Sequence, residues 1–490
     1  MSAMEPDTPP PASRSDGGLA RRFVVGGLYV SIGSWATNVV NFAIGLLLAR
    51  SLGPEIFGLY AFVAAVDQLV GMVGAFSLQL ALVQHPRESD RLYDTAFALS
   101  ALLGVAGLAV ALAIAPVVAH FRSAHAAWLL LVLGVARVMT LASQAPMARL
   151  ERNLQFRRVA AVGVLSLNLP NVAALGLALL GAGAWSLIGK DVLHGAMMLA
   201  LAFWLSDYRF RGRIDAKAAG ELMAFGRPML LSRALEIAVD RIDRLLVGSW
   251  LGNVPLGLYN QARVLAETPA VATRTLSPLA FNLYSRLQGE PRRLAHASHV
   301  LNYLLVRGML AATTTLLIFP VETIRLLLGG DWLAAAPVLR WLAAYATLLP
   351  LFESLKVLLL GRGAVRATTV VRAVQLGLLV PGIAVASALA SVDLVAAALL
   401  ASTTVGIVLE RRFNRDVLDW SLRDLLALPC AVVAAVWLAF AWGADGLRMT
   451  LPFWLLPFLP PLVYALLLAA VEHRGLAARL AYLRGVVRAG

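Results

Sequence analysis

The chain has 490 residues, of which 60% are hydrophobic and only 14% are charged, and its mean hydropathy is +0.77. A soluble domain carries roughly 45–50% apolar and about 25% charged residues, so this composition excludes a soluble enzyme or binding domain and predicts a membrane protein. The net charge of +14 does not predict nucleic-acid binding, because the basic residues lie in short clusters between apolar segments.

The apolar segments, taken in chain order, predict an all-α, polytopic protein with about 14 transmembrane helices, each of about 20 residues or more. A polar stretch that is rich in Pro, Ser and Gly comes first and is expected to be disordered. Most Lys and Arg residues of the loops fall on one side of the membrane when the N-terminus is placed inside. By the positive-inside rule, both termini are therefore expected to be cytoplasmic.

A short motif, Leu-Gly followed by four residues and then Gly-Leu-Tyr, occurs at 52–60 and again at 251–259. The two copies occupy equivalent turns, six predicted helices apart, which favours two six-helix lobes as parallel pseudo-repeats with a site between them. Two unrelated turns are the alternative. The expected organisation is a disordered cytoplasmic tail at 1–22, an N-lobe at 23–205, a cytoplasmic inter-lobe loop at 206–220, a C-lobe at 221–410, two additional helices at 411–471 and a cytoplasmic tail at 472–490.

The seventh predicted span, at about 221–249, carries charged residues on one face. At about 100° per residue, that face holds Arg233, Glu236, Asp240, Asp243 and Arg244. A charge inside the bilayer is costly, so we expect this face to line a water-filled cavity.

Arginine holds phosphate oxygens through a planar fork of donors that stays charged. The predicted contacts to a pyrophosphate or glycan are therefore Arg233, Arg244, Arg263, Arg274 and Arg307. Ion coupling or charge balance is assigned to four acids, Glu236, Asp240, Asp243 and Glu267. The alternative is that these acids only neutralise the arginines, as pairs four residues apart on a helix can do.

A second charged group lies in the sixth predicted span, where Lys190 and His194 share a helix face and Asp191 lies beside them. A buried carboxylate or imidazole can couple transport to an ion gradient. These three residues, together with Asp67 in the second span, are therefore the N-lobe candidates for ion coupling. A structural ion pair with a satisfied histidine is the alternative, and the remaining histidines have no metal-ligand spacing.

Three segments resemble a known family: 49–60 (ARSLGPEIFGLY), 149–158 (RLERNLQFRR) and 240–248 (DRIDRLLVG). They are similar to the bacterial polysaccharide and O-antigen flippases of the multidrug/oligosaccharidyl-lipid/polysaccharide exporter superfamily. The resemblance implies a transporter, not an enzyme, in the bacterial inner membrane. It implies flipping of undecaprenyl-pyrophosphate-linked oligosaccharide for exopolysaccharide, lipopolysaccharide O-antigen or capsule biosynthesis. The implied mechanism is alternating access, with an H⁺ or Na⁺ gradient in place of any cofactor.

The partners implied by the resemblance are membrane lipid, the lipid-linked oligosaccharide, and the polysaccharide polymerase and glycosyltransferases of the same pathway. Two alternatives within the superfamily are a lipid II flippase and a cation-coupled small-molecule exporter. The alternative from another class is a membrane enzyme, such as a polysaccharide polymerase or ligase. Short predicted connections argue against the enzyme, because such enzymes need a sizeable outside loop to hold an acceptor.

Overall fold

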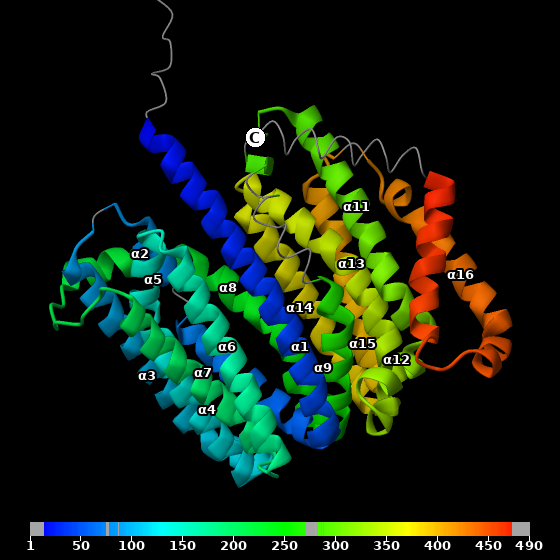
Figure 1. The fold of residues 1–490 in the computed structure, drawn as a ribbon, viewed down its shortest axis with the longest axis horizontal. Coiled ribbons are helices and arrows are strands. Elements are labelled where there is room, and N and C mark those ends of the chain that lie inside the picture. The colour runs from blue at the N-terminus through cyan, green and yellow to red at the C-terminus, as the bar shows by residue number, and fades with distance from the viewer. Residues whose placement is uncertain are drawn as a thin grey trace, which may run out of the picture. The chain divides into compact units, whose positions relative to one another are not determined.

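The structure of the chain is a computed structural model. It describes residues 14–472 apart from 75–77, 87, 271–279, 281–282, 286, 288 and 419. All regular elements in these residues are helical (Figure 1). The longer ones are α1 Arg14–Val70, α2 Leu78–Gln84, α3 Asp90–Phe121, α4 Ala124–Ala142, α5 Gln144–Arg152, α6 Phe156–Leu179, α7 Ala184–Leu205, α8 Ala216–Leu251, α9 Asn253–Glu267, α11 Pro291–Ile318, α12 Pro320–Leu327, α13 Ala336–Gly361, α14 Val365–Ala388, α15 Val392–Phe413 and α16 Leu422–Thr450.

Ten helices in the described residues are long and apolar enough to cross a membrane, and Leu456–Glu472 is a shorter apolar helix. The all-α, polytopic membrane fold is therefore confirmed, while the total of about 14 spans stays a prediction. Four predicted spans are not counted separately among the ten. Helix α8 is too charged, α9 with 15 residues and Leu456–Glu472 are too short, and α1 joins two predicted spans across Gly53, whose φ of 72° and ψ of 173° are not helical.

The chain divides into two compact units. Unit 1 contains residues 1–48, 73–117 and 127–230, and unit 2 contains residues 49–72, 118–126 and 231–490. Helix α1 begins at Arg14, inside the stretch predicted as a disordered tail, and residues 473–490 of the predicted C-terminal tail lie outside the described residues. The lobe and tail boundaries stay predictions.

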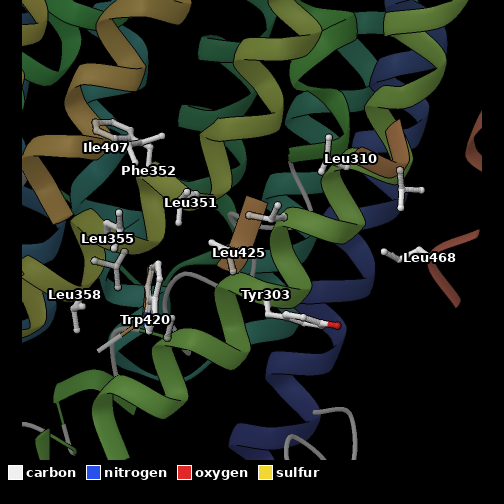
Figure 2. Close-up of a cluster of buried hydrophobic side chains, with 14 of the residues drawn as sticks. Tyr303, Leu310, Leu351, Phe352, Leu355, Leu358, Ile407, Trp420, Leu425 and Leu468 are labelled. Atoms are coloured by element: carbon white, nitrogen blue, oxygen red, sulfur yellow. The ribbon is translucent and has the colours of Figure 1, made fainter. Parts of the chain in front are cut away.

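In unit 2, α13 is the central helix. The apolar part of Gly330–Gly361 is 78% buried, against 28% for the corresponding part of α14, because α11, α15 and α9 all pack against α13. The core that results joins Tyr303 and Leu310 of α11, Phe352 and Leu355 of α13 and Ile407 of α15 (Figure 2). Close packing of this kind fixes the faces that α13 and α15 present to their neighbours.

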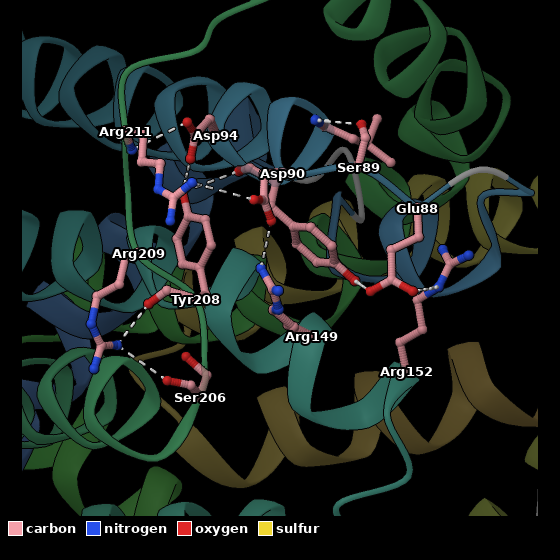
Figure 3. A network of polar contacts seen from close by, with 12 residues as sticks. Glu88, Ser89, Asp90, Asp94, Arg149, Arg152, Ser206, Tyr208, Arg209 and Arg211 are labelled. Atoms are coloured by element: carbon pink, nitrogen blue, oxygen red, sulfur yellow. Dashed lines mark hydrogen bonds and ion pairs between the residues drawn. The ribbon is translucent and has the colours of Figure 1, made fainter.

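In unit 1, the segment at 149–158 that carries part of the family resemblance supplies structural ion pairs. Arg149 pairs with Asp90 at 3.0 Å and its guanidinium lies 5.3 Å from the ring centroid of Tyr93 (Figure 3). Arg152 lies 3.7 Å from Glu88. These contacts attach α5 to the start of α3.

Buried Asp94 of α3 binds the connection between α7 and α8. This carboxylate accepts a hydrogen bond from the Tyr208 hydroxyl at 2.9 Å and from the backbone N–H of Arg211 at 3.2 Å (Figure 3). It also accepts one from the backbone N–H of Arg213 at 3.0 Å. Burial, followed by the hydrogen bond to Asp94, raises the pKa of Tyr208, so its hydroxyl stays a donor at neutral pH. The predicted cytoplasmic inter-lobe loop therefore has a defined conformation.

Candidate functional site

Unit 2 contains a polar cavity of about 410 Å³ that is lined by α8, α9, α13, α14 and α15. Pockets for small ligands are mostly apolar and measure about 300–1,000 Å³, so this one has an ordinary size and an unusual lining. Its charged and polar lining residues are Glu236, Asp240, Arg241, Arg244, Arg263, Glu267, Tyr345, Glu353, Lys356, Arg372, Gln375, Ser402 and Thr403.

Helix α8 places its charges on the cavity through its helical repeat. Glu236, Asp240 and Arg244 are spaced four residues apart and therefore lie on one face, and all three line the cavity. Asp243 belongs to the same face in the sequence, but it is fully buried behind the cavity wall. The charged composition of this face explains why α8 is less apolar than the other long helices.

Arg263 is neutralised by two acids. Its guanidinium forms an ion pair with Asp243, and its Nε donates to Glu267 Oε1 at 2.7 Å. Asp243 also accepts a hydrogen bond from the Tyr259 hydroxyl at 2.6 Å and from the backbone N–H of Arg244 at 2.7 Å. The carboxylate thus has three kinds of donor, as a buried charge requires. These contacts join α8 to α9 and leave Arg263 occupied within the protein.

Two further cations of the cavity are also paired. Lys356 lies 3.2 Å from Glu236 and 2.6 Å from Glu353. Arg372 lies 3.6 Å from Glu353, donates to Gln375 Oε1 at 3.2 Å and has its guanidinium 4.7 Å from the ring centroid of Phe352. Lys356 and Arg372 share Glu353, and we call these three residues the closed network. Both cations of the closed network already have an acidic partner within the protein.

Arg241 and Arg244 differ from these cations. Both line the cavity, and neither guanidinium forms a hydrogen bond or an ion pair within the described part of the chain. The Nε of Arg244 is buried without a partner. Asp240 also lines the cavity, and its carboxylate forms no hydrogen bond or ion pair within the described residues. The cavity therefore offers two arginines and one carboxylate whose charges are not already compensated by a direct contact.

The structure brings Arg244 and Arg263 together at the cavity, with the acids Glu236, Asp240 and Glu267. It places Arg307 elsewhere: this side chain is 3% exposed and forms a bidentate pair with Glu472, at 2.6 and 2.7 Å. The side chains of Arg233 and Arg274 lie outside the described residues.

The N-lobe candidates do not line the cavity. Lys190 and Asp191 lie 3.5 Å apart, and His194 Nδ1 is 2.6 Å from the carbonyl oxygen of Ser166. These contacts agree with the structural alternative for this group. Asp67, in unit 2, is 5% exposed and is not without a partner. Ion coupling by these residues stays a prediction.

Four charged residues that line the cavity were not predicted as site residues from the sequence: Arg241, Glu353, Lys356 and Arg372. Lys356 and Arg372 could have been found, because each is a cation inside an otherwise apolar predicted span. Arg241 could not, because it lies next to the expected polar face of α8 and only the position of its neighbours brings it to the cavity.

The sequence of this chain is similar to those of known polysaccharide biosynthesis proteins. The family model described as "Polysaccharide biosynthesis protein" matches residues 47–337. The chain is 26% identical over 309 residues to the succinoglycan biosynthesis transport protein ExoT of Rhizobium meliloti (strain 1021), covering 61% of this chain and 60% of that protein. It is 23% identical over 297 residues to the teichuronic acid biosynthesis protein TuaB of Bacillus subtilis (strain 168), covering 58% of this chain and 59% of that protein. The chain thus aligns with about three fifths of the length of these curated relatives.

Two solved structures show the fold. The lipid II flippase MurJ in an inward closed conformation has a TM-score of 0.72 at 12% identity, with 92% of this chain and 100% of that chain covered. An inward-facing multidrug resistance MATE family transporter of the MOP superfamily has a TM-score of 0.62 at 15% identity, with 78% and 95% covered. At these identities the likeness concerns the arrangement of helices.

Proposed function

This chain belongs to the polysaccharide biosynthesis protein family, and from that premise we propose that it flips lipid-linked oligosaccharide across the bacterial inner membrane. The proposed substrate is a repeat unit attached through pyrophosphate to undecaprenol. A relative named as a succinoglycan transport protein and a fold shared with a lipid II flippase support transport over an enzymatic role.

One observation carries the proposal. Arg241 and Arg244 line the cavity and their guanidinium groups form no hydrogen bond or ion pair within the described residues, whereas Arg263, Lys356 and Arg372 in the same cavity are each paired. Two neighbouring guanidinium groups match the charge and the oxygen geometry of a diphosphate. A buried polar group without a partner, such as Arg244 Nε, is costly unless a ligand or water completes it.

The cavity size limits what is held there. A volume of about 410 Å³ suits a diphosphate and an adjoining sugar, while the rest of the glycan and the lipid tail remain outside it. Gln375, Ser402 and Thr403 line the same cavity, and such groups hydrogen-bond sugar hydroxyls. We place the pyrophosphate at Arg241 and Arg244 and the first sugar toward α14 and α15.

We further propose alternating access driven by an H⁺ or Na⁺ gradient, with both termini in the cytoplasm. The excess of Lys and Arg in the predicted inside loops supports this orientation. A cation-coupled small-molecule exporter is the second candidate, and Asp240 favours it because an unpaired carboxylate in the cavity could hold a cation.

The test is a flipping assay in proteoliposomes with undecaprenyl-pyrophosphate-linked oligosaccharide. Replacing Arg241 and Arg244 together by alanine should lower the initial rate at least about tenfold, because charge-assisted contacts are worth about 1.5–3 kcal/mol each. Arg292, an exposed arginine at the start of α11, gives the matched control Arg292→Ala, which should keep the wild-type rate. Equal flipping rates in the double variant and in this control would overturn the assignment of the two arginines. If Asp240→Asn abolishes cation export and the arginine double variant does not, the exporter is favoured instead.

A further inference from the structure

Glu410, on α15, lies in the core beneath the polar cavity. It is seven residues after the cavity-lining Thr403 and therefore on the same helix face, about 10 Å farther along the axis. Between them, Gly406 packs so closely that an added Cβ would lie 2.7 Å from Gln375 Nε2 and 3.0 Å from Phe352 Cε2. Glu410 thus faces α13 and α14 directly below the closed network of Glu353, Lys356 and Arg372.

The Glu410 carboxyl group forms no hydrogen bond within the described part of the chain. It is 1% exposed, its Oε2 is buried without a hydrogen bond, and it forms no ion pair within the described residues. Asn414, one turn later, donates to the backbone oxygens of Glu410 and Leu355 and does not reach the carboxyl group. An ionised carboxylate buried in this way would cost several kcal/mol, whereas a neutral carboxylic acid would not.

In the described residues, three helices that carry charged side chains, α13, α14 and α9, pack on α15. Arg372 of α14 and Glu353 and Lys356 of α13 act on it electrostatically, and all three belong to the closed network. On α9, Arg263 and Glu267 are bound to each other. On α15 itself, Arg411 donates to the carbonyl oxygen of Trp420, and Arg412 is exposed. Arg372 is the cation that Glu410 would attract if it lost its proton.

We propose that Glu410 is a proton-binding site that is occupied in this conformation and that controls the charge of the polar cavity through Arg372. When the O–H bond of the acid breaks, the proton passes to water and the electron pair stays on the carboxylate. The new anion draws Arg372 away from Glu353 and Gln375, so the field over Arg241 and Arg244 becomes less positive. Binding of a diphosphate and binding of the proton then favour each other. This consequence for transport rests on the proposed function, while the proton site itself does not.

The proton site is tested by infrared spectroscopy of the full chain in nanodiscs at neutral pH. The wild type should show the C=O stretching band of a buried, protonated carboxylic acid, and the band should be missing in Glu410→Gln. Glu322→Gln, which changes a buried glutamate of α12 away from the cavity, should keep it. Glu410→Met removes the acid without a polar replacement and serves if the glutamine variant does not fold. Identical spectra for wild type and either Glu410 variant would overturn the proposal.

The coupling is tested by the affinity for inorganic pyrophosphate between neutral and alkaline pH. Reciprocal coupling predicts that the wild type loses about fivefold or more of its affinity relative to Glu410→Gln, which mimics the protonated acid at every pH. Parallel affinity curves for the two proteins would overturn the coupling. A failure of the proposed function shows instead as absent flipping with the carboxylic acid band still present.

Discussion

Gly58 and Gly257, at equivalent places in the two copies of the Leu-Gly motif, lie reciprocally against each other's turn. A Cβ atom on Gly58 would overlap the carbonyl oxygen of Asn253, and one on Gly257 would overlap the carbonyl oxygen of Pro54. Pro54 and Asn253 are themselves equivalent positions of the motif. Gly53 and Gly252, which precede them, both have positive φ, 72° and 102°. A contact with this two-fold relationship favours an internal repeat over two unrelated turns.

Neighbouring side chains reinforce this contact in unit 2. Arg122 donates to the Asn253 side chain at 2.6 Å, and its guanidinium lies 4.5 Å from the ring centroid of Phe62. Trp332 donates from Nε1 to the carbonyl oxygen of Ala49 at 3.1 Å and meets Phe57 edge to face. The motif residues therefore serve packing, and substitution of the glycines should act on stability before it acts on any ligand.

Gly58→Ala and Gly257→Ala should each destabilise the protein by about 1–3 kcal/mol, the usual effect of forcing an extra methyl group into a packed interior. Backbone is the obstacle at both sites, so no flexible side chain can yield. The measurement is thermal unfolding of the purified protein in detergent. Gly308→Ala, a helical glycine with nothing within 4 Å of the added Cβ, is the matched control and should be neutral or stabilising. A Gly58→Ala midpoint equal to that of the control would contradict the packing argument.

Asp243→Asn and Arg244→Ala should separate stability from binding. Removing the charge of Asp243 leaves the buried guanidinium of Arg263 with Glu267 alone, and breaking a buried ion pair costs about 3–5 kcal/mol. The Arg244 side chain forms no hydrogen bond or ion pair within the described residues, so its removal should leave the unfolding midpoint nearly unchanged and weaken inorganic pyrophosphate binding. Unfolding scans and equilibrium binding on both variants check this. The opposite pattern, an unstable Arg244→Ala and a stable Asp243→Asn, would be incompatible with the described ion pairs.

Arg307 and Glu472 should behave as a coupled pair. Glu472→Met leaves the buried guanidinium of Arg307 without its acid and should cost about 3–5 kcal/mol, and Arg307→Met, which leaves the partly buried Glu472 carboxylate facing Tyr303, should cost less. The double replacement removes both charges and should be less harmful than the sum of the two, with a positive coupling energy in a double-mutant cycle. Limited proteolysis gives a second readout, because Glu472 lies on the helix that the pair attaches to α11. Additive effects would show that the pair does not hold this helix.

How far the site could be predicted follows from these pairs. The helical repeat of α8 was enough to put Glu236, Asp240 and Arg244 on one face, because that information is local. The pair of Arg263 with Glu267, four residues away, is local in the same sense, whereas the pair of Arg263 with Asp243 depends on how α9 packs on α8. The partner of Arg307 is 165 residues away along the chain, and no local pattern can point to it.

Some features of the fold can likewise be predicted from local sequence, and others depend on tertiary packing. An all-helical membrane protein follows from composition and from the length of the apolar segments, both of which are local properties. The join of two spans at Gly53 and the burial of α13 at the centre of unit 2 depend on tertiary packing. Helices α8 and α9 are hard to recognise as spans from the sequence, because their charged side chains line a polar cavity and need no apolar surroundings.

Asp416 and Arg362 predict a pH dependence. Hydrogen bonds from Arg362, one of them from Nη1 at 3.1 Å, hold the pKa of Asp416 below its ordinary value. A carboxyl whose pKa is lowered in the folded state stabilises that state at neutral pH, and the stabilisation is lost as the pH falls through the lowered pKa. The side chain of Asp416 is 58% exposed, so the pair is worth about 0–1 kcal/mol and is weakened by salt.

Asp416→Asn should therefore unfold at a slightly lower temperature than wild type at neutral pH, and the two unfolding midpoints should converge in acid and at high salt. Asp207→Asn, at an exposed aspartate of the connection between α7 and α8, is the control and should show no such convergence. A difference between Asp416→Asn and wild type that grows as the pH falls would have the wrong sign for this pair.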